Sequence, residues 1–132
     1  MRLGYFSVGL VVSDIAASRA FYESLGFEMV AGDQSRNWVV LQNENARIGL
    51  FQGILERNTL TFNPGRDANN AALPDFTDVR DLQKSLKSRG ITPYSPIPAA
   101  DESATGPTCF TLTDPDGHQI LIDQRVPSPK KN

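Results

Sequence analysis

The spacing of apolar residues changes from strand-like to helical near the start of the chain. Residues 8–12 form a β-branched apolar run, and from residue 14 to 26 the apolar residues recur at helical spacing. Asp14 is a suitable N-cap for that helix, and Gly26 supplies the left-handed residue that ends it. The pattern predicts a strand followed by a helix over 14–26.

The second half of the chain repeats this pattern. Val79, Leu82 and Leu86 mark one helix face after Asp78, and Gly90 ends the helix. Asp14 and Asp78 are 64 positions apart, and so are Gly26 and Gly90. The matching cap and stop indicate an internal duplication.

Each half also closes on a predicted β-hairpin. Residues 38–41 and 48–51 flank a polar turn at 43–46, and residues 109–112 and 120–122 flank the turn Asp-Pro-Asp-Gly at 114–117. Each half is thus expected to be a strand, a helix and roughly three strands. Residues 53–70 are a turn-rich connector with an extended piece at 59–62, and residues 94–107 are a long proline-containing loop.

Composition narrows the classes of protein. The 132 residues fit one domain with its own core, and 39% hydrophobic with 21% charged residues is an ordinary globular balance. The net charge of −2, with no basic cluster except Lys130-Lys131, argues against nucleic acid and anionic membrane as partners. The single cysteine, Cys109, suits a reducing compartment, and no signal segment or membrane-length apolar stretch is visible, so we expect a cytoplasmic location.

Two pieces of the chain carry a family resemblance. Leu-Val-Val-Ser-Asp at 10–14, followed by Ser18, Phe21-Tyr22 and Leu25-Gly26-Phe27, and the closing residues 110–118 (Phe-Thr-Leu-Thr-Asp-Pro-Asp-Gly-His) resemble the vicinal oxygen chelate (VOC) superfamily, the glyoxalase, bleomycin-resistance and extradiol-dioxygenase group. The resemblance implies an α+β fold in which two tandem βαβββ modules form a curled mixed-sheet cup, usually in a homodimer. It places module one at about 4–53, the connector at about 54–70, module two at about 71–126 and a tail at 127–132 of a single domain, 1–132.

The resemblance implies that, in metal-dependent members, one divalent ion is held by four side chains, typically His or Glu. The matching positions here are Ser7, Gly49, Ala71 and Leu121. Three of these residues have no donor atom and the serine hydroxyl is a weak one, whereas such sites need three or four imidazole, thiolate or carboxylate groups. A shift of two residues along the strands adds one good ligand, Asp123. We therefore expect no divalent metal and no other cofactor in this site.

Alternation along the predicted strands separates a core face from a face that lines the cup. The core face is almost wholly apolar, and the cup face mixes small, aromatic and polar side chains, as ligand pockets do. The residues expected to line a ligand pocket are Ser7, Trp38, Arg47, Phe51, Asp75, Cys109, Thr111, Gln119, Leu121 and Asp123.

Several of these side chains have two interpretations. Trp38 and Phe51 can stack on a planar ligand or plug a shrunken cup, and Arg47 can pair with a carboxylate or phosphate or lie in solvent at the rim. Asp75 and Asp123 can form a carboxylate pair for proton transfer, although surface carboxylates are commoner.

Three functions stay open at this point. The first is a metal-free protein, similar to the bleomycin-resistance branch, that binds a small, partly aromatic or anionic molecule. The second is a glyoxalase-like lyase or isomerase, or a dioxygenase, with relocated metal ligands or acid–base chemistry through Asp75, Asp123 or the only histidine, His118. The third is an assembly module with a plugged cup. Cys109 is more often an inert thiol than a nucleophile. The sequence does not decide whether the protein is an enzyme.

Overall fold

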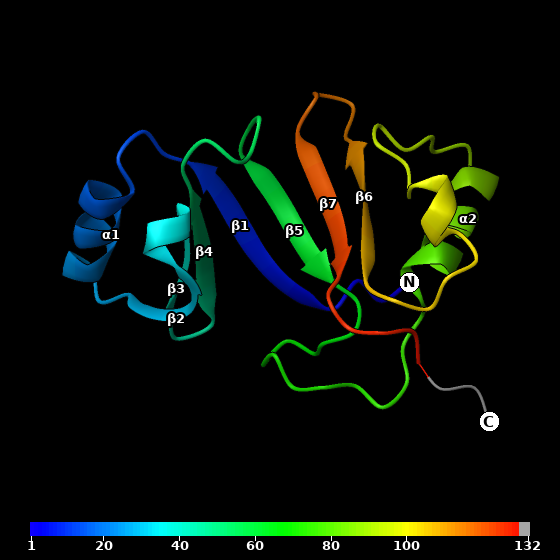
Figure 1. The fold of residues 1–132 in the computed structure, drawn as a ribbon, viewed down its shortest axis with the longest axis horizontal. Helices are drawn as coiled ribbons and strands as arrows, with labels where there is room; N and C mark the ends of the chain where they lie inside the picture. Colours follow the sequence, from blue (N-terminus) through cyan, green and yellow to red (C-terminus); the bar gives the residue numbers. More distant parts are fainter. Residues whose placement is uncertain (130–132) are drawn as a thin grey trace. The chain divides into compact units, whose positions relative to one another are not determined.

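The computed structural model describes residues 1–129 (Figure 1). In this part of the chain it contains seven β-strands and two α-helices, which confirms the predicted α+β class. The chain divides into two compact units, Ser7–Leu60 on one hand and Met1–Phe6 with the chain from Thr61 onward on the other. We call them the first and the second unit.

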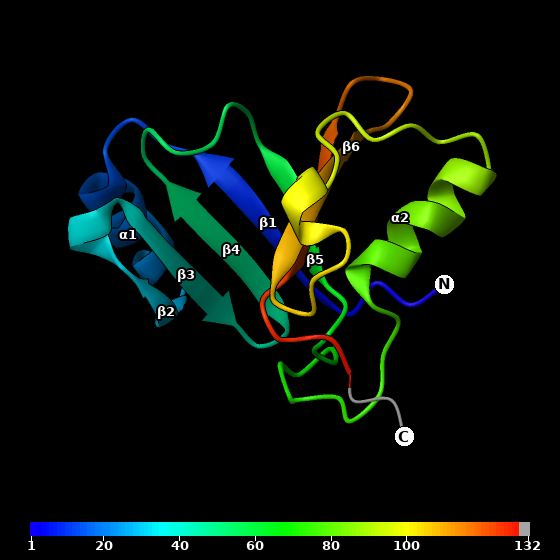
Figure 2. The ribbon, with the colours of Figure 1, turned by 45° about the vertical axis from the view of Figure 1, so that its right-hand side comes forward.

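The first unit contains the elements expected of module one. They are β1 (Tyr5–Val11), α1 (Ile15–Ser24), β2 (Glu28–Asp33), the 3-10 helix Gln34–Arg36, β3 (Trp38–Asn43) and β4 (Ala46–Phe51). The first two residues of β1, Tyr5 and Phe6, belong to the second unit. Hydrogen bonds order the strands β2-β3-β4-β1, with β1 parallel to β4 and the other neighbours antiparallel. Helix α1 packs against one face of β3 and β4 (Figure 2). The strand–helix–three-strand prediction for the first half is confirmed.

The ends of α1 follow from the residues that flank it. The Asp14 carboxylate accepts a hydrogen bond from the Ala17 N–H at 3.1 Å, and Gly26 has a φ of 97°, so the predicted cap and stop are both present. A second acceptor comes from far along the chain, because Oε1 of Gln52 accepts the Ile15 N–H at 2.9 Å. The core under the helix consists of Ile15, Val39, Leu41 and Leu50, joined by the partly buried Leu10, Val12, Tyr22, Phe27, Met29 and Ile48.

The second unit is built on the same plan with one strand fewer. Its elements are β5 (Thr59–Asn63, which begins in the first unit), α2 (Val79–Ser88), the 3-10 helix Ala99–Asp101, β6 (Thr108–Thr113) and β7 (Gln119–Gln124), and the strands lie in the order β5-β7-β6. Asp78 caps α2 by accepting the Arg80 N–H at 2.9 Å, and Gly90 has a φ of 84°. The core consists of Val79, Leu82, Leu86, Ile97, Phe110, Leu112 and Ile122.

The first strand of the second unit is not where the duplication predicted it. The segment containing Ala71 and Asp75 has only one isolated bridge, between Arg66 and Ala72, and the strand is β5, the extended piece noted inside the connector. The reason is a turn at Asp67, whose carboxylate accepts the N–H groups of Asn69 and Ala71 at 2.8 and 2.9 Å. A side chain that binds the backbone locally competes with strand pairing.

The middle strand of the second unit is reduced to a single bridge between Ser95 and Thr111. Pro93, Pro96 and Pro98 surround the bridge, and prolines cannot donate to a strand ladder. The prediction of roughly three strands after each helix is therefore wrong for this unit, whereas the long loop over 94–107 is present. Of the predicted tail 127–132, residues 130–132 lie outside the described part of the chain. Neither helix among residues 1–129 has the length and apolar character to span a membrane.

Candidate functional site

The face of the first unit's sheet opposite α1 carries an aromatic pair. Trp38 on β3 and Phe51 on β4 are direct partners across the strands, and their rings are nearly parallel, at 11° with centroids 6.3 Å apart. Both side chains are half-buried, so each keeps part of its surface at the solvent. Such a pair offers flat apolar surface for contact with another ring.

Two glycines lie beneath this pair and are covered by neighbouring side chains. Gly9 on β1 and Gly49 on β4 are register partners, and both are buried. A Cβ added at Gly49 would lie 2.6 Å from Cε2 of Phe51, and one added at Gly9 would lie 3.0 Å from Cδ1 of Leu55. The Phe51 ring therefore fills the space that a side chain at position 49 would need.

Ser7 and Arg47 lie on the same strands as these glycines. Ser7 is two residues before Gly9 on β1, and Arg47 is two residues before Gly49 on β4, so alternation places both on the glycine face. Both are half-buried, and Arg47 is the register partner of Gln42. A guanidinium at this place can bind a carboxylate or phosphate through paired hydrogen bonds.

The residues present do not fit the divalent ion of metal-dependent VOC proteins. Gly49 is covered by Phe51, Leu121 has no donor atom, and Ala71 is not on a strand. The strand that stands in place of the predicted Ala71 strand is β5, and its sequence, Thr-Leu-Thr-Phe-Asn, adds no His, Cys, Asp or Glu ligand. Within residues 1–129, no three His, Cys, Asp or Glu side chains are grouped so as to hold a metal ion.

In the second unit, β6 and β7 hold most of the other predicted lining residues. Cys109 is opposite Asp123, Thr111 opposite Leu121, and Thr113 opposite Gln119. The Thr111 hydroxyl accepts the Ser95 N–H at 3.0 Å, so it takes part in the edge of the sheet.

The charged groups of this hairpin are paired with near neighbours. Nε of Arg125 donates to the Asp123 carboxylate at 2.8 Å. Burial, and then the Asp123 carboxylate, raise the pKa of Cys109 above its ordinary value, which disfavours a reactive thiolate. His118 is 70% exposed, and its Nδ1 lies 2.8 Å from Oδ2 of Asp114 in the turn.

Asp75 is separate from this hairpin. It is exposed in the segment before α2, where it lines a pocket of about 1180 Å³ at the start of that helix. Asp123 is instead engaged by Arg125. The suggested proton-transfer pair of Asp75 and Asp123 is not among the hydrogen bonds and ion pairs of the described residues.

A buried polar cluster at the start of α2 was not predicted. Arg80, 8% exposed, donates to the Asp78 carboxylate, to the Asp101 carbonyl at 2.6 Å and to the Gly106 carbonyl at 2.8 Å. The Ser128 hydroxyl also donates to Asp78. Burial raises the pKa of Asp78, but the hydrogen bonds from Ser128, the Arg80 N–H, Gln124 and the Arg80 side chain outweigh it and lower the pKa below 3.8.

Part of this cluster could have been predicted from the duplication, because the two halves share a glutamine at the end of the closing strand. Gln124 at the end of β7 accepts the Val79 N–H at 2.8 Å, as Gln52 just after β4 accepts the Ile15 N–H. A glutamine therefore stands at the end of the closing strand in both halves and binds the first N–H of the helix. This role is structural, so the cluster supports the fold rather than a reaction.

The comparison with protein families agrees with this architecture. Residues 2–122 match the model of the Glyoxalase/Bleomycin resistance protein/Dioxygenase superfamily. The chain belongs to this superfamily. The predicted VOC resemblance is thereby confirmed. No curated protein matches the sequence of this VOC protein.

Solved structures of low sequence identity share the fold. A glyoxalase/bleomycin resistance protein/dioxygenase superfamily member from Vibrio splendidus 12B01 is 16% identical, with 90% of this chain and 97% of that chain covered and a TM-score of 0.59. Methylmalonyl-CoA epimerase from Mycobacterium tuberculosis is 15% identical over 96% and 92% of the two chains, with a TM-score of 0.61. The Mn(II)-bound glyoxalase from Novosphingobium aromaticivorans is 22% identical over 99% of this chain but 42% of its own, with a TM-score of 0.54.

Proposed function

We propose that this VOC protein binds a small, planar, anionic molecule on the glycine face of its first unit, without the divalent metal of its metal-dependent relatives. Trp38 and Phe51 would stack on the ring of the ligand, and Arg47 would pair with its carboxylate or phosphate. The observation that carries the proposal is the pair of half-buried, nearly parallel rings of Trp38 and Phe51, with the Phe51 ring lying over Gly49. Because both side chains are only half-buried, part of the flat apolar surface of the pair is left for contact with a planar ligand.

The polar groups on this face support an anionic ligand. Arg47 is the charged side chain that alternation places beside Gly49 on β4, and it is half-buried. A hydrogen bond to a charged group contributes about 1.5–3 kcal/mol, more than a neutral one, because partly buried sites screen charge less.

The acid–base alternative receives less support. His118 is 70% exposed in a turn, and Asp123 is bound to Arg125 at 2.8 Å. The ion pair with Arg125 keeps the Asp123 carboxylate from acting as a free base, and an exposed turn gives His118 no enclosed site in which to meet a substrate.

Fluorescence tests the proposal because Trp38 is the only tryptophan in the chain. The ligand probe is 4-nitrobenzoate, a planar anion that quenches tryptophan, titrated in the presence of excess EDTA. We expect saturable quenching. The neutral match, 4-nitrobenzamide, should bind about tenfold more weakly or worse, since it lacks the charge that Arg47 recognises. Cyclohexanecarboxylate, which is not planar, should compete poorly.

Two arginine variants locate the binding site. Arg47→Gln should raise the Kd for 4-nitrobenzoate about tenfold to a hundredfold, as expected for the loss of a charge-assisted hydrogen bond. Arg36→Gln is the matched control, because Arg36 is in the same unit and its side chain is 82% exposed; it should leave the Kd unchanged. Equal effects of the two substitutions, or quenching that requires added divalent metal, would refute the proposal.

A further inference from the structure

A short segment of the first unit reaches over the glycine face. Residues 53–57, which we call the strap, are the middle of the connection between β4 and β5. A Cβ added at Gly9 would lie 3.0 Å from Cδ1 of Leu55 in the strap and 3.4 Å from Cε2 of Phe51. Leu55 and Phe51 therefore share the space above Gly9, which is part of the surface proposed for ligand binding.

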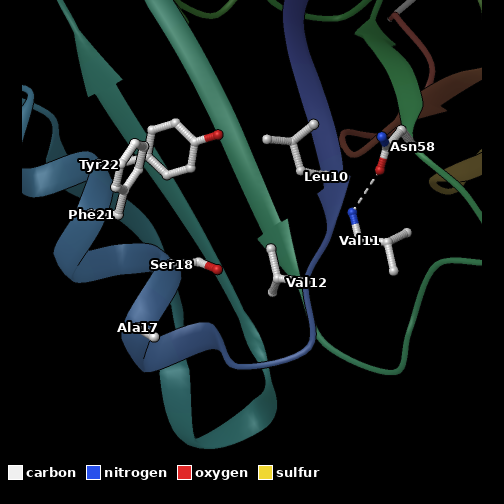
Figure 3. Close-up of a pocket in the computed structure, with 8 residues that line it drawn as sticks. All are labelled: Leu10, Val11, Val12, Ala17, Ser18, Phe21, Tyr22 and Asn58. Carbon is white, nitrogen blue, oxygen red and sulfur yellow. Dashed lines mark hydrogen bonds between the residues drawn. The ribbon is translucent and has the colours of Figure 1, made fainter.

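The strap is fixed to the first unit at both of its ends. Before it, the Gln52 N–H donates to the Asn37 carbonyl at 2.9 Å. After it, Oδ1 of Asn58 accepts the Val11 N–H at 2.9 Å, which is the hydrogen bond drawn in Figure 3. Only residues 53–57 lie between these two attachments. Leu55, at the centre of such a short span, is thus held against the sheet.

The other side chains of the strap are directed elsewhere. Ile54 is 52% exposed, although it is as large as Leu55, which is half-buried. Glu56 forms an ion pair with Arg57 at 3.6 Å inside the strap. Leu55 is therefore the apolar contact between the strap and the glycine face, and Ile54 is its solvent-facing neighbour.

Leu55 limits the width of the surface on which a ligand ring can lie. Trp38 on β3 is on one side of Phe51, with the ring centroids 6.3 Å apart, and Leu55 covers Gly9 of β1 on the other. Strand β4, which carries Phe51, lies between β3 and β1, and neighbouring strands are about 5 Å apart. A ligand ring in contact with Phe51 thus has about one strand spacing before it meets Leu55.

We propose that Leu55 sets the size of the ligand and that the site takes planar anions with a single ring, of the benzoate type. This size limit rests on the proposed function, because it concerns the same face. With the anionic group held by Arg47, a second fused ring would extend into the space that Leu55 occupies. A misfit of this kind in an apolar site changes binding by about 10–200-fold.

Isothermal titration calorimetry of the full chain in excess EDTA tests the size limit with two probes, 4-nitrobenzoate and its two-ring counterpart 6-nitro-2-naphthoate. The larger probe has more apolar surface, so without a steric limit it would bind more tightly. We expect the wild type to bind it about tenfold more weakly or worse. Leu55→Ala should lower the Kd of the two-ring probe about tenfold or more, and should change that of the single-ring probe by less than about threefold.

Two further variants make the test specific. Ile54→Ala is the matched control, because it shortens a side chain of the same size in the same strap on the exposed side; it should leave both Kd values unchanged. Leu55→Val removes less of the side chain and keeps the test valid if Leu55→Ala does not fold. It should lower the Kd of the two-ring probe by about threefold.

The possible results separate the size limit from the proposed function. A wild type that binds 4-nitrobenzoate and binds the two-ring probe equally well or better would overturn the size limit and leave the proposed function standing. A ratio of the two Kd values that does not change in the Leu55 variants, or that changes as much in Ile54→Ala, would do the same. If the wild type binds neither probe, the proposed function fails and the size limit fails with it.

Discussion

Gln124 provides a quantitative test of the duplicated fold. Its side chain is fully buried and makes three hydrogen bonds: Oε1 accepts the Val79 N–H at 2.8 Å, and Nε2 donates to the Asp78 carboxylate at 3.2 Å and to the Val126 carbonyl at 3.1 Å. Gln124→Leu keeps the side chain close to its original size but leaves these three partners without the bonds. Each unsatisfied buried polar group costs about 1–3 kcal/mol, and some of the three can reach water after relaxation. We expect the free energy of unfolding to fall by about 3–5 kcal/mol.

The equivalent change in the first half is the control. Gln52 is half-buried and makes one such bond, to the Ile15 N–H at 2.9 Å, so Gln52→Leu leaves one donor that water can reach. We expect a loss of about 1 kcal/mol. Urea unfolding followed by circular dichroism measures both variants against the wild type. Equal losses for the two substitutions would refute the reasoning, because the difference in burial and bond number would then have no energetic effect.

Three further predictions concern acid stability, backbone strain and the aromatic pair. The pKa of Asp78 is lowered in the folded state, so its contribution to stability is present above its unfolded pKa of about 3.8 and is lost as the pH falls through the folded value; the Tm of Asp78→Asn should therefore change less between pH 4 and pH 2 than that of the wild type, and parallel curves by circular dichroism would count against this. Gly32 has a φ of 98°, and a Cβ there would lie 2.7 Å from the backbone of Trp38 and Val39, whereas Gly53 has a φ of 71° and open space. Gly32→Ala should thus cost about 3 kcal/mol or more and Gly53→Ala about 1 kcal/mol, and similar losses in chemical denaturation would exclude the steric explanation. Phe51→Ala should cost about 2 kcal/mol, roughly half the value for a fully buried phenylalanine, and should shift the Trp38 emission to longer wavelength; an unchanged spectrum would show that the rings are not in contact.

Local signals in the sequence were sufficient for the elements that they specify. Asp14 and Gly26 mark the two ends of α1, and Asp78 and Gly90 mark the two ends of α2, because caps and left-handed stops act on the nearest backbone groups. The Asp-Pro-Asp-Gly turn likewise forms the β6–β7 hairpin. These features depend on a few adjacent residues, so they can be predicted without knowledge of the tertiary structure.

The duplication predicted less well where the two halves diverge. Extending the 64-residue offset back from Asp78 pointed to Ala71, but the turn at Asp67 inserts residues between the strand and the helix, and the strand is β5. The offset is valid only where no insertion intervenes. The middle strand of the second unit was lost for a similar local reason, the prolines around Ser95.

The candidate site was predictable in part. Alternation placed Trp38, Arg47 and Phe51 on the face opposite the core. The core under α1 contains Val39, Leu41 and Leu50, and Phe51 contacts Gly49 on the other face, in agreement with this placement. Alternation cannot show that the Phe51 ring lies over Gly49, since that depends on a rotamer. Alternation puts Asp123 and Arg125 on the same side, two residues apart, but the ion pair between them depends on the rotamers of both side chains, which the sequence does not give.

Native mass spectrometry of the freshly purified protein tests the central claim most directly, because it weighs the chain together with whatever it retains. The proposal predicts subunits that carry no stoichiometric divalent metal and that gain the mass of one 4-nitrobenzoate when the probe is added, with the gain lost in Arg47→Gln. One Zn, Mn, Ni or Fe ion per subunit, with probe binding abolished when that ion is removed, would contradict it.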